Sequence, residues 1–311
     1  MNIAFVGIGS IASRHIRNLI KCLKERHLSY SIDVYRSGFG RPIDDSISTF
    51  INNQYDVKED VRKDYDIVFI TNPTSLHFDT LVKFKDHGNF FFIEKPVFDS
   101  VDVDLNKLSP IDDDKCYVAS PLRYNPVIQY VKSMINNKNI YSCRAICSTF
   151  LPNWRPGVDY RSTYSAHKDM GGGVEIDLIH EWDYLSFLFG LPKKVNSIIS
   201  RKSNLEIDSN DIAIYIAEYN DMLVELHLDY FGRKETRQLQ LFTDGDAITC
   251  NLLTGEIEFA KDNKIIKLDY ERDTFQIAEM NHFLDMVQYG NKSDNTIEHA
   301  IKVLKIAKGL E

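Results

Sequence analysis

A glycine turn between a strand and a helix constrains this chain more than any other feature. Residues 1–6 form a short apolar run, Gly7-Ile-Gly9-Ser-Ile-Ala12 follows directly, and an apolar helical pattern covers residues 11–24. This order is typical of the opening of a dinucleotide-binding βαβ unit, in which a pyrophosphate lies at the helix N-terminus. An ordinary βα turn with two glycines is the alternative, but the position of the turn between a strand and a helix favours the nucleotide site.

Each position of the turn has an expected role in cofactor binding. Gly7 permits the tight turn, Gly9 lets a pyrophosphate approach the backbone, and Ala12 still allows close packing of the helix on the strand. The backbone N–H groups of Ser10 and Ile11 lie at the start of the helix, where the positive end of its dipole favours phosphates.

The composition excludes several classes of function. Of the 311 residues, 43% are hydrophobic and 26% are charged, as in a soluble globular protein with room for two domains. The net charge of −8 and the lack of a basic run argue against a nucleic-acid partner. No stretch approaches the roughly 18 apolar residues that span a bilayer, so no membrane partner is expected. Residues 2–6 are expected to belong to a core strand, so no signal peptide is expected either. The five scattered cysteines form no C-x-x-C pair and predict reduced thiols in the cytoplasm.

The first 120 residues alternate between strands and helices. Residues 76–87 have a helical pattern, and apolar strand-like runs recur at residues 31–35, 66–71, 89–93 and 115–119. This alternation predicts an N-terminal Rossmann domain over residues 1–121, with a doubly wound parallel sheet.

The pattern changes after Pro126. Helices are expected at residues 174–190, 274–289 and 295–309, and strand-like segments at 140–150, 195–201, 211–219, 222–230, 236–242, 247–251, 256–261 and 264–270. The sequence therefore predicts an α/β chain whose second domain, residues 122–311, is α+β with a large, mostly antiparallel open sheet. Because helices would cover only one face of this sheet, we expect a homodimer or homotetramer through the other face.

Lys95 is the first candidate for chemistry. Glu94-Lys95-Pro96 follows the fourth predicted strand, and the carboxyl ends of the strands in such a sheet face the ligand crevice. A lysine there could exchange a proton with a substrate if burial and nearby cations lowered its pKa. A solvated lysine is the alternative, and it is favoured when the motif is taken alone.

A second candidate follows the three consecutive glycines at residues 171–173. Asp177, His180 and Asp183 are spaced by three, so on one predicted helix they share a face, where carboxylates could fix the imidazole tautomer and raise its basicity. Asp177 and His180 could also bind a metal, but no third ligand is evident and no metal site is predicted. A histidine satisfied by a helix neighbour is the remaining alternative.

Arg36 and Ser37 lie at the tip of the second predicted strand, where a Rossmann fold reads the adenosine ribose. An arginine and a hydroxyl suit a 2′-phosphate, whereas an acidic residue would suit a free 2′-hydroxyl. Asp33 is the competing residue, but it lies inside the strand and short of the tip. The sequence therefore predicts an NAD(P) cofactor and favours NADP over NAD.

Several motifs together resemble the Gfo/Idh/MocA oxidoreductases, the family of glucose–fructose oxidoreductase and inositol dehydrogenase, over essentially the whole chain. They are Gly7-x-Gly9-x-x-Ala12, Thr71-Asn72-Pro73 with His77, Glu94-Lys95-Pro96, Arg123-Tyr124-x-Pro126 and the triple-glycine helix with Asp177 and His180. The resemblance implies that Lys95 and His180 are catalytic and that Asp177 supports them. It also implies that Thr71, Asn72, Pro73 and His77 border the cofactor, with Glu94 near the nicotinamide ribose.

One departure concerns the histidine helix. Many family members have the spacing Asp-x-x-x-His, whereas here Asp177 and His180 are spaced Asp-x-x-His. His180 keeps its relation to Asp183, so the departure concerns the role of Asp177 and not that of His180. Glu181 takes a position that is often apolar or small in the family.

The segment from Trp154 to Ser165 resembles a subgroup of enzymes from bacterial surface-polysaccharide and nonulosonic-acid sugar pathways. Its arginines and aromatic residues suit a polar, anionic sugar, although an irregular surface segment is the alternative. The substrate-binding residues expected from this comparison are Arg123, Tyr124, Trp154, Arg155, Tyr160, Arg161, Tyr164 and Asp183.

These features together predict an oxidoreductase that transfers a hydride between nicotinamide and a carbinol carbon of a sugar, sugar derivative or cyclitol. Lys95 and His180 would handle the hydroxyl proton, with Asp177 or Asp183 orienting the imidazole. An NAD-dependent glycosidase of the same fold and a dinucleotide-binding regulator remain as alternatives. The presence of both Lys95 and His180 argues against the regulator.

Overall fold

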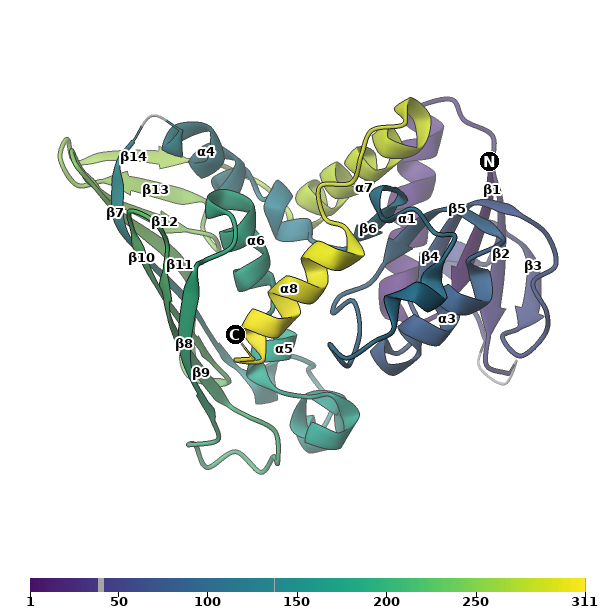
Figure 1. The fold of residues 1–311 in the computed structure, drawn as a ribbon, viewed down its shortest axis with the longest axis horizontal. Coiled ribbons are helices and arrows are strands. Elements are labelled where there is room, and N and C mark those ends of the chain that lie inside the picture. The colour runs from purple at the N-terminus through teal and green to yellow at the C-terminus, as the bar shows by residue number, and fades with distance from the viewer. Residues whose placement is uncertain (39–41, 137, 311) are drawn as a thin grey trace. The chain divides into compact units, whose positions relative to one another are not determined.

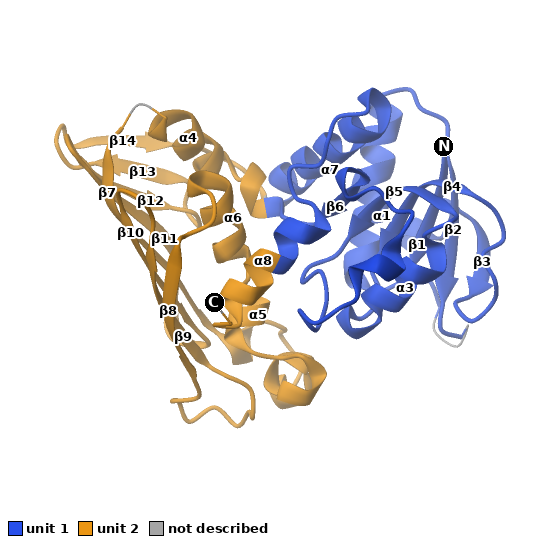
Figure 2. Cartoon of the chain, viewed as in Figure 1, with its two compact units in different colours: residues 1–121, 273–301 blue, residues 122–272, 302–311 orange. Residues whose placement is uncertain are grey.

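The computed structural model describes residues 1–38, 42–136 and 138–310, and the chain divides into two compact units. Unit 1 combines Met1–Pro121 with Asp273–Ile301, and unit 2 combines Leu122–Arg272 with the residues from Lys302 on (Figure 2). One division between the two units falls after Pro121. The second domain expected from the sequence is continuous, however, whereas in the structure the segment 273–301 clusters with unit 1.

Unit 1 contains a six-stranded, fully parallel sheet in the order β3-β2-β1-β4-β5-β6. The strands are β1 (Asn2–Val6), β2 (Ser31–Arg36), β3 (Ile51–Asp56), β4 (Tyr65–Ile70), β5 (Gly88–Ile93) and β6 (Cys116–Val118). The helices are α1 (Ser10–Glu25), α2 (Asp45–Ser48), α3 (His77–Phe84) and α7 (Arg272–Tyr289). This strand order is that of the dinucleotide-binding doubly wound fold, so the predicted Rossmann sheet is confirmed.

An aromatic cluster explains why α7 packs with unit 1. Phe69 of β4 and Phe92 of β5 are buried, and Phe283 of α7 meets their rings edge-on at 5.9 and 5.2 Å. At the end of α1, the guanidinium of Arg26 donates to Asn281 at 2.9–3.1 Å and to Asp285 at 2.7 Å. The helix that follows unit 2 in sequence therefore completes the core of unit 1.

Unit 2 contains an eight-stranded sheet in the order β14-β13-β12-β11-β7-β10-β9-β8 (Figure 1). The strands are β7 (Ile140–Phe150), β8 (Lys194–Ser200), β9 (Ile212–Glu218), β10 (Leu223–Asp229), β11 (Phe231–Thr243), β12 (Ala247–Asn251), β13 (Glu256–Phe259) and β14 (Lys264–Lys267). All neighbouring pairs are antiparallel except β7 with β10. The predicted open, mostly antiparallel sheet is confirmed, but it is no simple meander because β7 inserts between β10 and β11.

Helices cover one face of this sheet. They are α4 (Pro126–Ile135), α5 (Val174–Asp177) and α6 (His180–Phe189), while α8 (Ile297–Ala307) spans the division between the units. On the covered face, Trp182 of α6 meets the buried ring of Tyr215 edge-on at 5.2 Å. The neighbouring side chains of β9, Ile214 and Ile216, point to the opposite face and are exposed. Strand alternation thus separates a helix-covered face from an open one.

Two further expectations concern the whole chain. All five cysteines are free and buried, and burial raises their thiol pKa values. Among the described residues, no helix has the length and apolarity needed to cross a membrane.

Candidate functional site

The turn between β1 and α1 requires glycine at Gly7. Its φ is +91°, and a Cβ atom there would lie 2.6 Å from the backbone of Asn72, which follows β4. The Gly7 amide also donates to the carbonyl of Tyr35 at the end of β2, at 2.8 Å. The turn is therefore held against the carboxyl ends of both neighbouring strands.

The N-terminus of α1 has the features of an anion site. Gly9 is the N-cap residue and gives no side-chain cap, and the first turn, which starts at Ser10 and Ile11, carries no acidic residue. A Cβ atom on Gly9 would meet nothing within 4 Å, so the space beside the turn is open. Ala12 is fully buried, as its predicted packing role requires. Uncapped N–H groups and open space suit the pyrophosphate of a dinucleotide.

The residues after β4 tie this turn to the sheet. The Thr71 hydroxyl donates to the carbonyls of Val6 and Gly7 at 3.1 and 2.9 Å. Asn72 donates through Nδ2 to Thr80 at 2.7 Å, and Pro73 is the N-cap of the next short helix. Among the described residues, none donates a hydrogen bond to the buried Oδ1 of Asn72. An acceptor left in this way beside the glycine turn fits a donor group of a bound dinucleotide.

His77 joins the ends of β4 and β5. Its Nε2 lies 3.0 Å from the carbonyl of Asn72, and its Nδ1 lies 3.1 Å from the carbonyl of Val97. The ring is buried, and this burial lowers its pKa although both carbonyls favour the protonated form. His77 thus bridges the segments that follow β4 and β5 through its two ring nitrogens.

Glu94 and Lys95 lie directly after β5, as predicted. The Glu94 amide donates to the carbonyl of Ile70, and its side chain accepts from the Lys95 amide at 3.1 Å and contacts the ring of His15. Burial raises the pKa of Glu94, but the hydrogen bond and charge of His15 and the charge of Lys95 outweigh it and hold the pKa below its usual value. Glu94 is therefore a carboxylate, next to a half-buried Lys95 and the cis-linked Pro96.

The residues of β2 that could contact the adenosine ribose lie in different surroundings. Asp33 is fully buried, where it accepts from Asn53 at 2.8 Å and Tyr65 at 3.1 Å and pairs with Lys63 at 3.0 Å. Arg36 is the last residue of β2, and its Nε donates to the carbonyl of Gly38 at 3.0 Å. Ser37 follows it and is exposed. The carboxylate of Asp33 thus belongs to the core, whereas Arg36 and Ser37 lie at the strand tip.

In unit 2, the expected helix over residues 174–190 is two helices. α5 ends at Asp177 and α6 begins at His180, with the amide of Ile179 bonding the carbonyl of Ile176 and that of Glu181 the carbonyl of Leu178. These i→i−3 bonds tighten the chain between the helices. The expectation that Asp177, His180 and Asp183 share one continuous helix face is therefore wrong.

The two aspartates around His180 have different partners. Asp177 accepts from the hydroxyl of Tyr230 at 2.5 Å. Both carboxylate oxygens of Asp183 accept from the guanidinium of Arg123, at 3.0 and 2.8 Å, and both residues are buried. His180 itself is half-buried at the first residue of α6.

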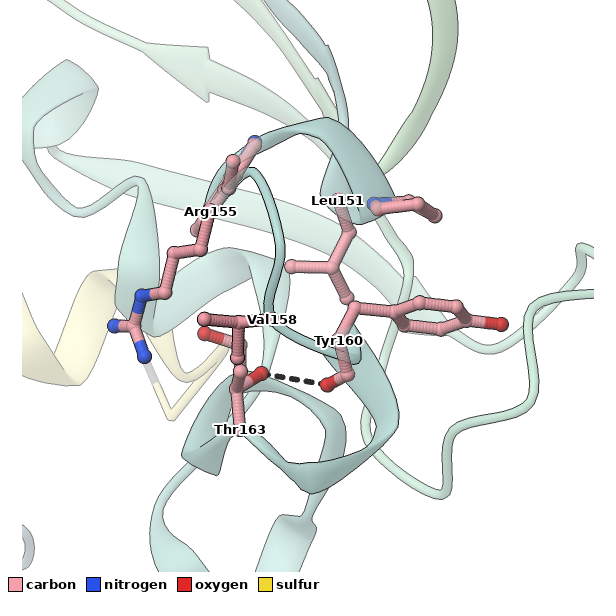
Figure 3. A pocket seen from close by; sticks show the side chains of 8 residues that line it. Leu151, Arg155, Val158, Tyr160 and Thr163 are labelled. Carbon is pink, nitrogen blue, oxygen red and sulfur yellow. Dashed lines mark hydrogen bonds between the residues drawn. The ribbon is translucent and has the colours of Figure 1, made fainter.

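A small cavity lies within the loop that is expected to bind substrate. Its volume is about 10 Å³, enough for one water molecule (Figure 3). Trp154 packs edge-on against Tyr230 at 5.3 Å, and Arg155 lies over the Tyr164 ring at 5.5 Å. Tyr124 is half-buried beside Arg123.

Charge compensation distinguishes the arginines of this loop. Arg161 donates to both oxygens of Asp159 and to Glu206 at 2.8–3.1 Å, while the Tyr160 hydroxyl accepts from the amide of Glu206 at 3.2 Å. Arg155 is exposed. The positive charge of Arg161 is thus already paired with acids of this chain.

Two contacts of the candidate residues were not expected from the sequence. His15 contacts Glu94, and Tyr230 donates to Asp177. Tyr230 ends a predicted strand and His15 lies within a predicted helix, so neither carries a motif that would have singled it out.

Comparisons with known proteins agree with this architecture. Residues 1–108 match the sequence model of a family described as "Oxidoreductase family, NAD-binding Rossmann fold". The uncharacterized oxidoreductase YrbE of Bacillus subtilis (strain 168) is 25% identical over 191 residues, which cover 60% of this chain and about half (52%) of that protein.

Solved structures share the fold over nearly the full length. A levoglucosan dehydrogenase in complex with NADH has a TM-score of 0.84 at 16% identity, covering 99% of this chain and 95% of that one. The myo-inositol 2-dehydrogenase of Lactobacillus plantarum has a TM-score of 0.77 at 17% identity, with the same coverage. At these identities, the likeness is one of fold.

Proposed function

We propose that this chain is a member of the Gfo/Idh/MocA family of oxidoreductases and that it is an NAD(P)-dependent dehydrogenase acting on a CH–OH group. The observation that carries the proposal is the uncapped start of α1 behind Gly7 and Gly9 in a sheet of Rossmann order. The substrate class that we propose is a sugar, sugar derivative or cyclitol. The names of the levoglucosan and myo-inositol dehydrogenases of the same fold support that class.

Lys95 and His180 are the proposed proton carriers. When bound, the nicotinamide supplies the hydride chemistry. The Lys95 amine, at the carboxyl end of β5, and the His180 ring, at the start of α6, would take or return the hydroxyl proton of the substrate. Asp177, fixed by Tyr230, and Asp183, fixed by Arg123, would hold the start of α6 in place.

The roles of Lys95 and His180 can be tested by substitution. We expect Lys95→Ala and His180→Ala each to lower turnover by about 10²–10⁴-fold, because a placed proton carrier contributes that much. NAD(P)H affinity should stay nearly unchanged. Turnover would be followed by the absorbance of reduced nicotinamide with a panel of myo-inositol, levoglucosan and nucleotide sugars. The control is His87→Ala, which removes a surface imidazole paired with Asp64. Full turnover in both variants would refute the proposed roles.

The same assay separates the alternative functions. A dehydrogenase changes the amount of free NAD(P)H in proportion to product. An NAD-dependent glycosidase would release sugar without net change of the nucleotide, and a regulator would bind it without either reaction. Net turnover of nucleotide with any member of the panel therefore selects the dehydrogenase.

We propose NADP rather than NAD as the preferred cofactor, because Arg36 and Ser37 occupy the tip of β2 while Asp33 is bound within the core. A charge-assisted contact to a 2′-phosphate is worth about 1.5–3 kcal/mol, or on the order of ten- to a hundredfold in affinity. We therefore expect NADPH to bind more tightly than NADH, and Arg36→Ala to reduce that difference without weakening NADH. Equal affinities of the unaltered protein for both nucleotides, measured by fluorescence titration, would contradict the preference.

The surface-polysaccharide and nonulosonic-acid subgroup would require a cation for an anionic substrate. Arg161 and Arg123 are paired with acids of the chain, so Arg155 is the arginine of the set that we propose to contact such a substrate. We also propose that the open face of the unit 2 sheet joins two copies of the chain.

A further inference from the structure

Three side chains with metal-binding atoms gather in unit 2, and none of them is among the residues proposed for catalysis. One ligand atom each of His167, Asp169 and Asp208 lies within 4.8 Å of the other two. His167 and Asp169 lie in or next to the short 3₁₀ helix Lys168–Met170, and Asp208 lies between β8 and β9. The imidazole is half-buried, and both aspartates are exposed.

The backbone holds these two segments together. The Asp208 amide donates to the carbonyl of Ala166 at 3.0 Å, and the Ser209 hydroxyl donates to the carbonyl of Ser165 at 2.6 Å. A Cβ atom on Gly172 would lie 2.2 Å from the carbonyl oxygen of Tyr164, so the turn can pack here only around a glycine. These hydrogen bonds therefore hold the segment before His167 against the segment that carries Asp208, as a preformed site requires.

The ring of His167 presents one particular nitrogen to the aspartates. Its Nε2 lies 2.7 Å from the carbonyl of Arg161, and a carbonyl only accepts, so Nε2 carries the hydrogen. In the neutral ring, Nδ1 then has the free lone pair, and it lies 3.9 Å from Oδ2 of Asp208. Metal-ligating histidines donate their other ring N–H to a carbonyl or carboxylate in this way.

The two carboxylate oxygens of Asp208 also have different neighbours. Its Oδ1 accepts from the backbone amide of Lys168 at 2.7 Å, which leaves Oδ2 as the oxygen nearer to His167. A lone pair and carboxylate oxygens repel one another unless a proton or a cation lies between them. Either a protonated imidazole or a bound metal ion resolves this repulsion.

We propose that His167, Asp169 and Asp208 bind a divalent transition-metal ion of the Mn²⁺ or Zn²⁺ type. One imidazole nitrogen and two carboxylate oxygens suit such ions, and the two carboxylates balance the charge. Water would complete the coordination. The ion would link the segment after the loop 154–165 to the connection between β8 and β9. This site does not depend on the dehydrogenase function proposed above.

The test uses the full chain, treated with a chelator and dialysed, with Mn²⁺ alone and no nucleotide or sugar. We expect calorimetry to detect saturable binding of one Mn²⁺ per chain, and we expect Mn²⁺ to raise Tm. Asp169→Asn removes a ligand from an exposed side chain, so it should fold normally and weaken Mn²⁺ binding at least about tenfold. Asp208→Asn keeps an acceptor for the Lys168 amide and should weaken binding similarly.

The control variant is His282→Ala. It removes the ring from another surface pair, in which His282 Nε2 lies 3.1 Å from Asp294, and among the described residues this pair belongs to no three-ligand group. It should leave Mn²⁺ binding unchanged. The proposal is overturned if the unaltered chain shows no saturable binding, or if the Asp169→Asn, Asp208→Asn double variant binds Mn²⁺ as tightly. Either result would assign the cluster to an ion pair of protonated His167.

Discussion

Gly7 and Gly9 lie two residues apart, but their surroundings differ. The space that a Gly7 side chain would need is filled by the backbone of Asn72, and its φ of +91° is unfavourable for other residues. The position of a Gly9 side chain is open, and its φ of −115° is ordinary for any residue. Gly7 is thus required by the fold, and Gly9 by the proposed ligand.

This difference leads to a paired prediction. Gly7→Ala should lower the free energy of unfolding by at least about 1–3 kcal/mol, because it adds strain and a clash with backbone. Gly9→Ala should change stability by no more than about 0.5 kcal/mol, yet weaken NAD(P)H on the order of tenfold, about 1.4 kcal/mol, since its methyl group stands beside the phosphate site. Chemical denaturation and fluorescence titration would measure the two effects. Unchanged nucleotide affinity in Gly9→Ala would argue against a pyrophosphate at this turn.

Sequence reasoning located single residues well where a local rule applied. Arg36 and Lys95 could be placed at strand ends because a strand, its end and the following turn are read from neighbouring residues. The partners of the charged residues could not be read in this way. Arg123 and Asp183 are 60 residues apart, and Asp177 and Tyr230 are 53 apart, so only the folded chain brings them together.

The same limit applies to the proposed metal ligands. His167 and Asp169 are close in sequence, but Asp208 comes from another connection, and three residues at this spacing match no metal-binding motif. The signal lies in the backbone bonds that join the segments 165–168 and 208–209.

At the scale of elements, periodicity predicted most strands and failed where side chains do not alternate. β3, with the sequence INNQYD, is an edge strand whose polar residues carry no apolar signal. α2 has only four residues, and α4 begins directly at Pro126, where the sequence indicated only a change of pattern. The break between α5 and α6 was missed because the apolar pattern continues through Leu178 and Ile179, which are both buried.

A buried ion pair holds α6, the second helix after the three glycines. Arg123 is 1% and Asp183 8% exposed, and two hydrogen bonds join them. Asp183→Ala should lower the free energy of unfolding by about 3–5 kcal/mol, because it leaves the guanidinium buried without its carboxylate. Urea denaturation followed by circular dichroism would measure this loss.

The matched control for this prediction is Arg161→Ala. Arg161 forms a similar two-oxygen pair with Asp159, but on the surface, where solvent screens the charges. Its removal should leave stability nearly unchanged. Equal losses in Asp183→Ala and Arg161→Ala would mean that burial does not determine the contribution of these pairs.

At the scale of the whole molecule, the parallel and the antiparallel sheet could be predicted from the sequence. The return of a late helix to the first unit could not. The sequence indicates a parallel and an antiparallel part because strand spacing and turn residues are local features. The return of α7 to unit 1 and the insertion of β7 between β10 and β11 depend on contacts between distant segments, such as Phe283 with Phe69. A pattern of apolar residues shows that a helix needs a partner surface, but it does not identify that surface.

Several aliphatic side chains are exposed on the open face of the unit 2 sheet. Ile198 of β8 pairs with Ile214 of β9, and Ile216 and Leu223 lie on the same face. Ile198 is 68%, Ile216 52% and Leu223 50% exposed. Large exposed apolar patches on a protein surface can mark a protein–protein interface. A second copy of the chain would cover them by an isologous contact between two such faces.

Light scattering after gel filtration tests this assembly. We expect the unaltered chain to have the mass of a dimer or tetramer at micromolar concentration, and Ile216→Glu to shift it towards the monomer, because the contact would bury an unpaired carboxylate from each copy. The circular dichroism spectrum should not change, since Ile216 is exposed within one copy. Tyr289→Glu is the control, because Tyr289 is 71% exposed at the end of α7 and lies outside this sheet. A monomeric unaltered chain, or an Ile216→Glu variant of undiminished mass, would mean that the exposed isoleucines serve no self-association.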